Sequence, residues 1–139
     1  MPERYPPEDP REWLNRATSN LILANIVPSN ELYFEDLCYN AQQAAEKAIK
    51  AVCIAYNIQF PYVHDLAALV TVLLNHNISV PDSVLESAKL TRFAIATRYP
   101  YLLLPVSETE YCRSVLIAEN VVRWSENEIM KLRGGTDTS

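Results

Sequence analysis

The sequence AQQAAEKAIKA, residues 41–51, lies at the centre of a longer stretch, residues 32–56, that contains neither glycine nor proline. Most of these residues are strong helix formers, so we predict one helix over the whole stretch. At about 100° per residue, apolar side chains cover most of the surface of that helix, which is typical of a helix surrounded by neighbours. Its alanines would let those neighbours approach closely. We therefore expect this helix to be the central element of the fold.

A narrow polar stripe runs along the same helix. It is formed by Gln43, Glu46, Lys47 and Lys50, which fall within roughly a third of the helix circumference. The stripe is either a solvated edge or the lining of a site, and the solvated edge is the simpler interpretation. The two lysines lie within one turn of each other, so we expect their charges to reach one patch.

Proline and glycine divide the rest of the chain. Both glycines lie in the last six residues, four prolines lie in the first ten, and the other five separate apolar segments with helical spacing. No segment shows the sustained alternation of a strand. The sequence thus predicts an all-α fold of five helices in a single domain. They are expected at about 10–26, 32–56, 64–75, 81–99 and from 107 onward.

Three of these helices have recognisable start signals. Asp9 is expected to cap the first helix, and Ser29 or Asn30 the second. Ser107 and Glu110, three residues apart, form a capping box at the start of the last helix. These signals predict where the helices begin.

Composition excludes several classes of function. The net charge is −5 and the basic residues are scattered, which argues against a surface for duplex DNA. No glycine precedes residue 134, so a glycine-rich phosphate loop is excluded. His64, His76 and the cysteines are too dispersed for a zinc site. We therefore expect no metal and no cofactor.

The cysteines and the apolar segments indicate where the protein resides. Cys38, Cys53 and Cys112 contain no CxxC pair, and we interpret all three as buried small hydrophobic residues. No apolar run approaches the roughly 18 residues of a membrane-spanning helix. The polar, proline-rich first ten residues do not resemble a signal peptide. A cytoplasmic protein is expected.

Two short motifs away from the central helix are candidates for a binding site. At the predicted start of the third helix, Asp65 would be favoured by the helix dipole, or His64 and free first-turn amides could hold an anion. At the end of the fourth helix, Arg98 and Tyr99 precede Pro100. A cation is favoured there on structural grounds, yet arginine also binds phosphate and tyrosine stacks on bases. Both interpretations of each motif stay open.

Three motifs in this order resemble the HEPN domain family: QAAEKAIKA at residues 43–51, HDL at 64–66 and TRYP at 97–100. The first helix with Trp13 and the last helix with Trp124 are also similar, so the resemblance covers residues 10–131. It implies an up-and-down bundle of about five helices that is commonly a homodimer. We expect residues 1–9 and 132–139 to be flexible termini.

The resemblance also implies a role tied to nucleotides or RNA. Prokaryotic members are often encoded beside a minimal nucleotidyltransferase and form toxin–antitoxin or related defence pairs. Some members are metal-independent ribonucleases, which carry a histidine about four to six residues after an arginine. Here no arginine has a histidine at that spacing, since Arg98 is followed by YPYLLL. Ribonuclease activity therefore does not carry over.

We accordingly predict a nucleotide- or RNA-associated binding module that is not itself an enzyme, is a homodimer, and has a minimal nucleotidyltransferase as a possible partner. A dimer that acts only through protein contacts is the first alternative. A ribonuclease with a rearranged site, using Arg98 and His64, is the second. The candidate ligand-binding residues are Arg98, Tyr99, Lys47, Lys50, His64 and Arg92.

Overall fold

The protein folds as a bundle of helices, and the computed structural model describes residues 1–96 and 105–137, with the side chains of Ala96 and of residues 134–137 left aside. No strand occurs in these two ranges. The predicted all-α fold is therefore confirmed. The elements are α1 (Pro10–Ala24), α2 (Phe34–Ala55), α3 (Leu66–Asn75), α4 (Asp82–Leu85), the 3₁₀ helix η1 (Glu86–Leu90), α5 (Thr91–Ala96) and α6 (Glu108–Asp137).

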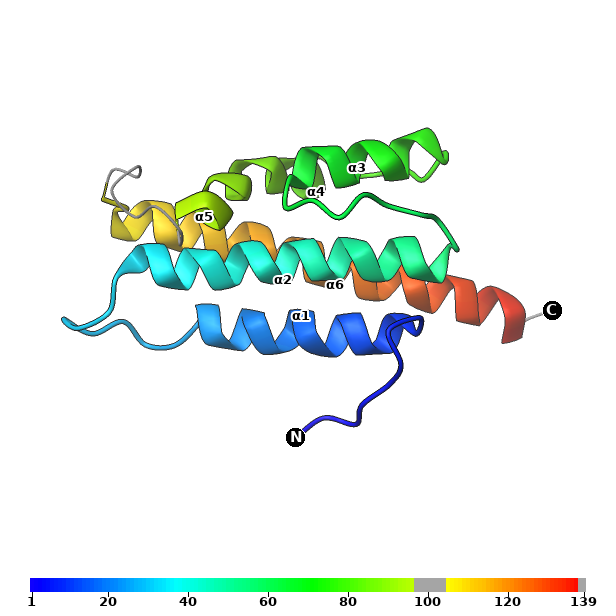
Figure 1. Cartoon of the computed structure of the whole chain (residues 1–139), viewed down its shortest axis with the longest axis horizontal. Coiled ribbons are helices and arrows are strands. Elements are labelled where there is room, and N and C mark those ends of the chain that lie inside the picture. Colours follow the sequence, from blue (N-terminus) through cyan, green and yellow to red (C-terminus); the bar gives the residue numbers. More distant parts are fainter. Residues whose placement is uncertain (97–104, 138–139) are drawn as a thin grey trace.

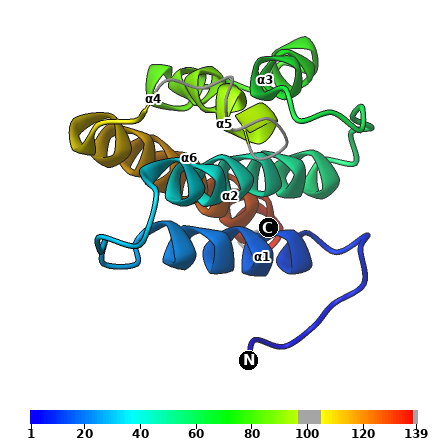
Figure 2. The ribbon, with the colours of Figure 1, turned by 60° about the vertical axis from the view of Figure 1, so that its left-hand side comes forward.

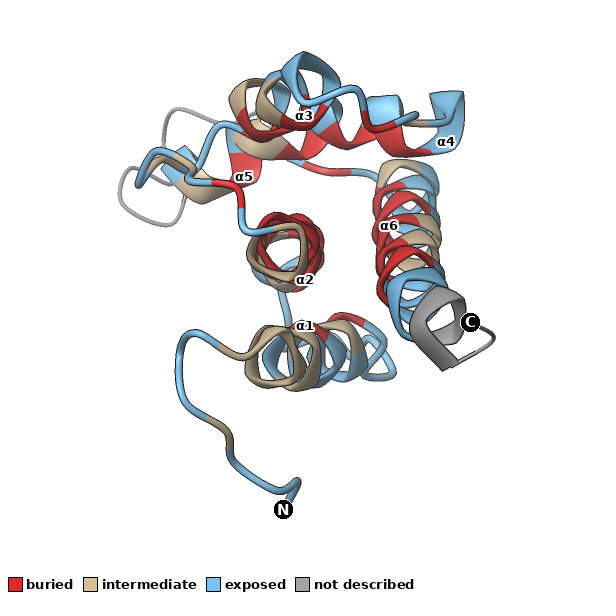
Figure 3. Cartoon of the chain, turned by 90° about the vertical axis from the view of Figure 1, so that its right-hand side faces the viewer, coloured by how far each residue is buried: buried red, intermediate tan, exposed pale blue. Residues whose placement is uncertain are grey.

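Helix α2 is the centre of the bundle, as predicted. Viewed end-on, it is enclosed by α1, α6 and the layer of α3 to α5 (Figure 3). Fourteen of its 22 residues are buried. Five of these are alanines that are fully buried, which is why the neighbouring helices can lie so close to its axis. They are Ala41, Ala44, Ala45, Ala48 and Ala51.

Helices α1 and α6 pack on α2 and begin where the sequence predicts. The Asp9 carboxylate accepts a hydrogen bond from the Arg11 amide at 2.9 Å, which caps α1. At the start of α6, the Ser107 hydroxyl oxygen accepts a bond from the Glu110 amide at 3.1 Å, as a capping box requires. Tyr111 on α6 then donates its hydroxyl proton to the Ala24 carbonyl at 2.6 Å and so ties α6 to α1.

Two predicted helix starts are wrong. Helix α2 begins at Phe34 after Tyr33, which provides no side-chain cap, because Ser29 instead forms a local turn with the Glu31 amide. Helix α3 begins at Leu66, two residues later than expected, and Asp65 is its N-cap. An N-cap residue lies outside the helix and bonds to its first amides. His64 therefore belongs to the connection that leads into α3.

The last helix is longer than expected. Helix α6 runs to Asp137, and so it continues through Gly134 and Gly135, which lie in the segment that we expected to be a flexible terminus. A glycine in a helix costs only about 1 kcal/mol relative to alanine, and this is too little to end every helix in which it occurs.

The predicted fourth helix is divided into α4, η1 and α5. Its buried side chains explain why, since Val84, Ser87, Leu90 and Phe93 follow one another at intervals of three. On an α-helix each such step drifts by about 60°, whereas on a 3₁₀ helix with three residues per turn the side chains align. Burial of all four residues on one side therefore favours the tighter helix in the middle of this segment.

The cysteines differ in their environments. Cys38 and Cys53 are buried on α2, and desolvation raises the pKa of each thiol to about 11. Cys112, in contrast, is exposed on α6, so its interpretation as a buried residue is wrong. No helix in the described ranges is long and apolar enough to cross a membrane.

Candidate functional site

The polar stripe on α2 is mostly inside the protein. Gln43, Glu46 and Lys50 are 9%, 3% and 7% exposed, and Gln42 beside them is fully buried. The interpretation of the stripe as a solvated edge is therefore wrong for these residues. Only Lys47 is partly exposed. Buried polar groups need hydrogen-bond partners, and the partners define the site.

Glu46 is the hub of the buried network. Its Oε2 accepts from the Lys50 amine at 3.1 Å. Its Oε1 accepts from the Gln42 amide nitrogen at 3.0 Å and from His64 Nδ1 at 2.9 Å. The Gln42 side-chain oxygen accepts in turn from Gln43 at 2.7 Å. The carboxylate thus has three partners, which is enough to satisfy it away from water.

The network is covered by the connection between α2 and α3, which folds back along α2 (Figure 1, Figure 2). Phe60 from this connection and Trp13 from α1 lie edge to face, with ring centroids 6.3 Å apart. The Lys50 amine lies 5.9 Å from the Trp13 ring centroid and 5.7 Å from that of Phe60. At these distances the rings attract the cation, and they also exclude water from the Glu46–Lys50 pair.

His64 is the part of the network that reaches solvent. Its side chain is 61% exposed although Nδ1 is bonded to Glu46. The neighbouring amides at the start of α3 are not free to bind an anion, as one interpretation of the sequence required. The Leu66 amide donates to the Thr91 hydroxyl oxygen, and the amides of Ala67 and Ala68 donate to Asp65.

Lys47 and Lys50 do not share one patch. The Lys47 amine donates to the Asn20 side-chain oxygen on α1 at 2.8 Å, and Asn20 donates to Asn40. Desolvation against α1 lowers the pKa of Lys47. Lys50 is paired with Glu46. The structure therefore joins Lys50 with His64 and separates Lys47 from them.

Arg92 lies elsewhere, between α5 and α6. Its guanidinium pairs with Glu110 at 3.0 Å and lies 4.6 Å from the Phe93 ring centroid. The hydrogen bond from Arg92 holds the pKa of the Glu110 carboxyl below its ordinary value. The other two candidates, Arg98 and Tyr99, lie outside the described residues.

Sequence reasoning missed the aromatic side of this site. Tyr62 is 96% exposed on the connection and touches Phe60 edge to face, with centroids 6.3 Å apart. The available signal was the alternation of Phe60, Tyr62 and His64 around Pro61. No group of three or more potential metal ligands occurs in the part of the chain that the structure describes.

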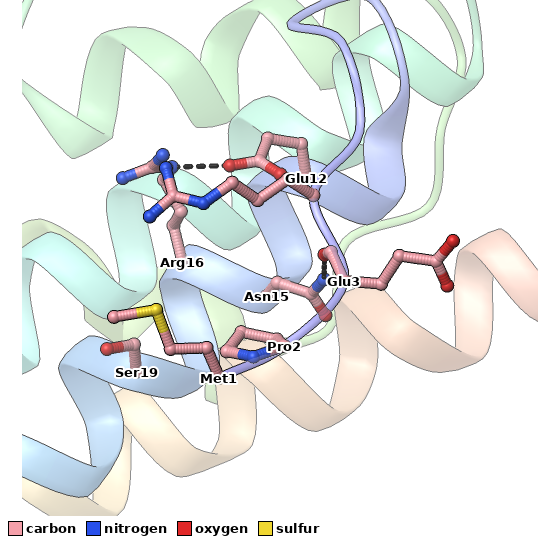
Figure 4. A pocket seen from close by; sticks show the side chains of 8 residues that line it. Met1, Pro2, Glu3, Glu12, Asn15, Arg16 and Ser19 are labelled. Atoms are coloured by element: carbon pink, nitrogen blue, oxygen red, sulfur yellow. Dashed lines mark hydrogen bonds and ion pairs between the residues drawn. The ribbon is translucent and has the colours of Figure 1, made fainter.

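A separate cavity of about 230 Å³ lies between the N-terminal segment and α1 (Figure 4). Part of its polar lining is already paired, since Arg16 bonds to Glu12 and the Asn15 amide donates to the Glu3 carbonyl. The cavity contains none of the predicted ligand-binding residues. It is lined by Met1, Pro2, Glu3, Arg4, Glu12, Asn15, Arg16 and Ser19.

Comparisons with known proteins place this chain and its fold in a family. The sequence model of the HEPN domain matches residues 10–129. The crystal structure of TT1696 from Thermus thermophilus is similar, with a TM-score of 0.73 and 28% identity over 86% of this chain and 97% of that one. ST0689, an archaeal HEPN homologue, shares the fold, with a TM-score of 0.69 and 23% identity over 87% and 98% of the two chains. No curated protein matches the sequence. The chain belongs to the HEPN domain family, whose helical fold is associated with nucleotides and RNA.

Proposed function

We propose that this protein is a non-catalytic module that binds a nucleotide or RNA, and that it acts with a minimal nucleotidyltransferase in a toxin–antitoxin or defence-type pair. The binding role is supported by the Glu46 network and by the family. The pairing is supported by the resemblance of residues 43–51, 64–66 and 97–100 to members encoded beside such enzymes.

The observation that carries the binding role is a buried ion pair that reaches solvent through one histidine. Burying Glu46 and Lys50 costs desolvation energy, and the attraction between the two charges need not recover that cost. Stability alone is therefore a weak reason for a protein to keep such a pair. Here Glu46 of the pair orients His64, whose side chain is 61% exposed and which lies two residues after the exposed Tyr62. An oriented polar group next to an exposed aromatic ring is the combination that recognises a base.

The phosphate contact is assigned to Arg98 in this proposal, and Tyr99 is assigned to stack on a base. Lys50 and Arg92 already form ion pairs with carboxylates, and Lys47 already donates to Asn20. These three cations are therefore less available to bind a phosphate. Arginine binds phosphate through two parallel hydrogen bonds, and this suits Arg98 to the role.

The test is calorimetric titration of ATP and GTP into the wild type, Arg98→Ala and the control Arg123→Ala, which alters an exposed arginine on α6. Losing a charge-assisted contact costs about 1.5–3 kcal/mol, so Arg98→Ala should bind about ten- to a hundredfold more weakly. Arg123→Ala should bind as the wild type does. Equal affinity in all three proteins would remove Arg98 from the site, and no binding of ATP or GTP to any of them would reject a free nucleotide as the ligand.

A second candidate is a dimer that acts only through protein contacts. It is favoured by large apolar side chains exposed at the end of α1 and in the connection to α2, since such patches commonly mark interfaces. Sedimentation should give a dimer, and a monomer at micromolar concentration would reject it. A dimer whose melting temperature does not respond to nucleotides would favour this candidate over the first. The side chains are Ile22, Leu23, Ile26, Val27, Leu32 and Tyr33.

A ribonuclease is the third candidate, because Glu46 holds His64 as carboxylates hold catalytic histidines. Cleavage of RNA also needs a positively charged group beside the catalytic histidine, because negative charge develops in the transition state. In residues 1–96 and 105–133, no arginine is paired with His64. We expect the purified protein to leave RNA intact. Cleavage that is abolished by His64→Ala would favour this candidate instead.

A further inference from the structure

The tyrosine of the α2–α3 connection is almost entirely exposed. Tyr62 is 96% exposed, and among the described residues its one ring contact is the edge-to-face contact with Phe60. Both faces of the Tyr62 ring are therefore open to solvent. Phe60, which contacts Tyr62, packs in turn against Trp13 on α1. An open aromatic ring on a fixed base is suited to stacking.

His64, two residues after Tyr62 in the same connection, presents a defined hydrogen-bond acceptor. Because a carboxylate oxygen of Glu46 accepts from Nδ1, the proton of the neutral imidazole is on Nδ1, and Nε2 is the acceptor. No residue within the described ranges donates to Nε2. Tyr62 and His64 are two residues apart, and the Val63 amide donates to the Pro61 carbonyl at 3.0 Å, which bends the chain at Tyr62. The Cα atoms of Tyr62 and His64 are therefore no farther apart than the about 7 Å that two extended residues span. Both side chains can therefore reach one ligand.

Charge at this position favours a base over a phosphate. The Lys50 cation is neutralised by Glu46, and Asp65 beside His64 is negative. No unpaired cation lies among the residues that we have placed here, so an anion gains nothing from this surface. A flat, neutral ring with a hydrogen-bond donor is the complementary ligand.

We propose that Tyr62 and His64 form a subsite for an unpaired nucleobase that carries an exocyclic amino group. The base stacks on the Tyr62 ring, and its amino group donates to His64 Nε2. Adenine, cytosine and guanine carry such a group, whereas uracil offers only carbonyl oxygens in its place. This inference rests on the proposed nucleotide or RNA binding and adds the class of base that is selected. It assigns the phosphate to another part of the protein.

The test compares labelled single-stranded oligoadenylate, oligocytidylate and oligouridylate of about ten nucleotides, together with AMP and UMP, by fluorescence anisotropy or competition. Wild type should bind the adenine and cytosine strands more tightly than the uracil strand. Tyr62→Ala should weaken adenine binding by about tenfold, since stacking on an aromatic ring contributes about 1–3 kcal/mol per base. Tyr62→Phe keeps the ring and should retain the affinity.

Two controls separate the subsite from general effects. Met130→Ala removes another large exposed side chain, 65% exposed on α6, and should change nothing. His64→Asn keeps a donor for Glu46 but lacks the Nε2 acceptor, so it should remove the preference for adenine over uracil. Melting temperatures close to that of the wild type would show that the variants are folded.

The outcomes distinguish the subsite from the proposed function. Oligonucleotide binding that is unaffected by Tyr62→Ala would overturn the subsite and leave the proposed function in place. Equal wild-type affinity for the adenine and uracil strands would overturn the role of His64. No binding of any strand or mononucleotide would overturn both. If AMP competes as well as oligoadenylate does, the ligand is a free nucleotide, and if only the strand competes, it is RNA.

Discussion

Helix α2 and the segment from α4 to α5 are both free of glycine and proline, yet they fold differently. Helix α2 is continuous over 22 residues, whereas residues 82–96 are divided between two short α-helices and a 3₁₀ helix. Helix α2 is rich in alanine and is buried on several sides, and an α-helix directs its side chains to all of these sides. The shorter segment is buried along one line of residues three apart, so the 3₁₀ geometry serves it better.

The two segments also differ in what they do with charge. Each contains a glutamate–lysine pair one turn apart, but Glu46 and Lys50 have side chains only 4% and 9% exposed, whereas Glu86 and Lys89 are 45% and 66% exposed. The surroundings of a charged pair, and not its spacing in the sequence, therefore decide whether it is a solvated pair or part of a site. The same substitution made in both segments tests this difference.

The largest difference is expected for Glu46→Gln against Glu86→Gln. The first leaves the Lys50 cation buried without a counter-charge, which should lower the free energy of unfolding by about 3–5 kcal/mol. The second removes a solvated pair and should cost less than about 1 kcal/mol. Urea denaturation measures both. If Glu46→Gln is too unstable to measure, adding Lys50→Met should restore much of the stability, because the charge is then gone.

Equal stability changes in the two glutamine variants would break the comparison. They would mean that Lys50 is hydrated and that α2 has a solvated face after all.

The next difference concerns alanine. Ala48 on α2 is fully buried, and Ala88 on η1 is exposed. Ala48→Leu should overpack the contacts around α2 and cost about 1–3 kcal/mol. Ala88→Leu should change stability by no more than about 0.5 kcal/mol. Thermal unfolding measures both, and an unchanged melting temperature for Ala48→Leu would show that α2 is not central.

Two hydroxyl groups of the divided segment should respond with opposite signs. Ser87 is fully buried and its hydroxyl has no hydrogen-bond partner among the described residues, whereas the Thr91 hydroxyl accepts from the Leu66 amide at 3.1 Å. Ser87→Ala should therefore raise stability by about 1 kcal/mol, and Thr91→Val should lower it by about the same amount. A destabilised Ser87→Ala protein would show that the hydroxyl has a partner, such as a water molecule.

The smallest effect is the dependence on pH of the contact between α5 and α6. Arg92 lowers the folded-state pKa of Glu110 below the ordinary 4.5, so the contact stabilises the protein above that pH. This stability is lost as the pH falls through the lowered pKa. Glu110→Gln should flatten the loss of stability below about pH 4.5, and Arg92→Gln should do the same. Acid titrations in which both variants keep the wild-type slope would show that the ion pair is absent in solution.

Local signals in the sequence predicted the fold well. The Asp9 cap and the Ser107–Glu110 box mark the starts of α1 and α6, because capping involves residues within one turn. The division of residues 82–96 was missed because helix propensity does not depend on which side of a segment is buried. The signal for this division was the spacing of Val84, Ser87, Leu90 and Phe93. That spacing can be interpreted only once the neighbour that buries these four side chains is known.

The site could be predicted only in part. Lys50 and His64 were both candidates, and both bond to Glu46 in the structure. Glu46 and His64 are 18 positions apart, and no local rule gives the path of the connection that brings them together. A helix projection places Glu46 and Lys50 on a polar face, and it cannot show that Trp13 and Phe60 cover that face. The alternation of Phe60, Tyr62 and His64 was the available signal for Tyr62, but an alternation does not show which ring the fold leaves exposed.

The central claim is that the polar face of α2 is an internal network that orients His64. It is tested most directly by a nitrogen–proton NMR correlation of the imidazole rings. The chain has two histidines, so His64→Asn identifies the signals of His64. We predict that the neutral His64 ring carries its proton on Nδ1, as the 2.9 Å contact with Glu46 requires, with Nε2 unprotonated. A proton on Nε2, or the averaged mixture of tautomers typical of a free imidazole, would contradict the account.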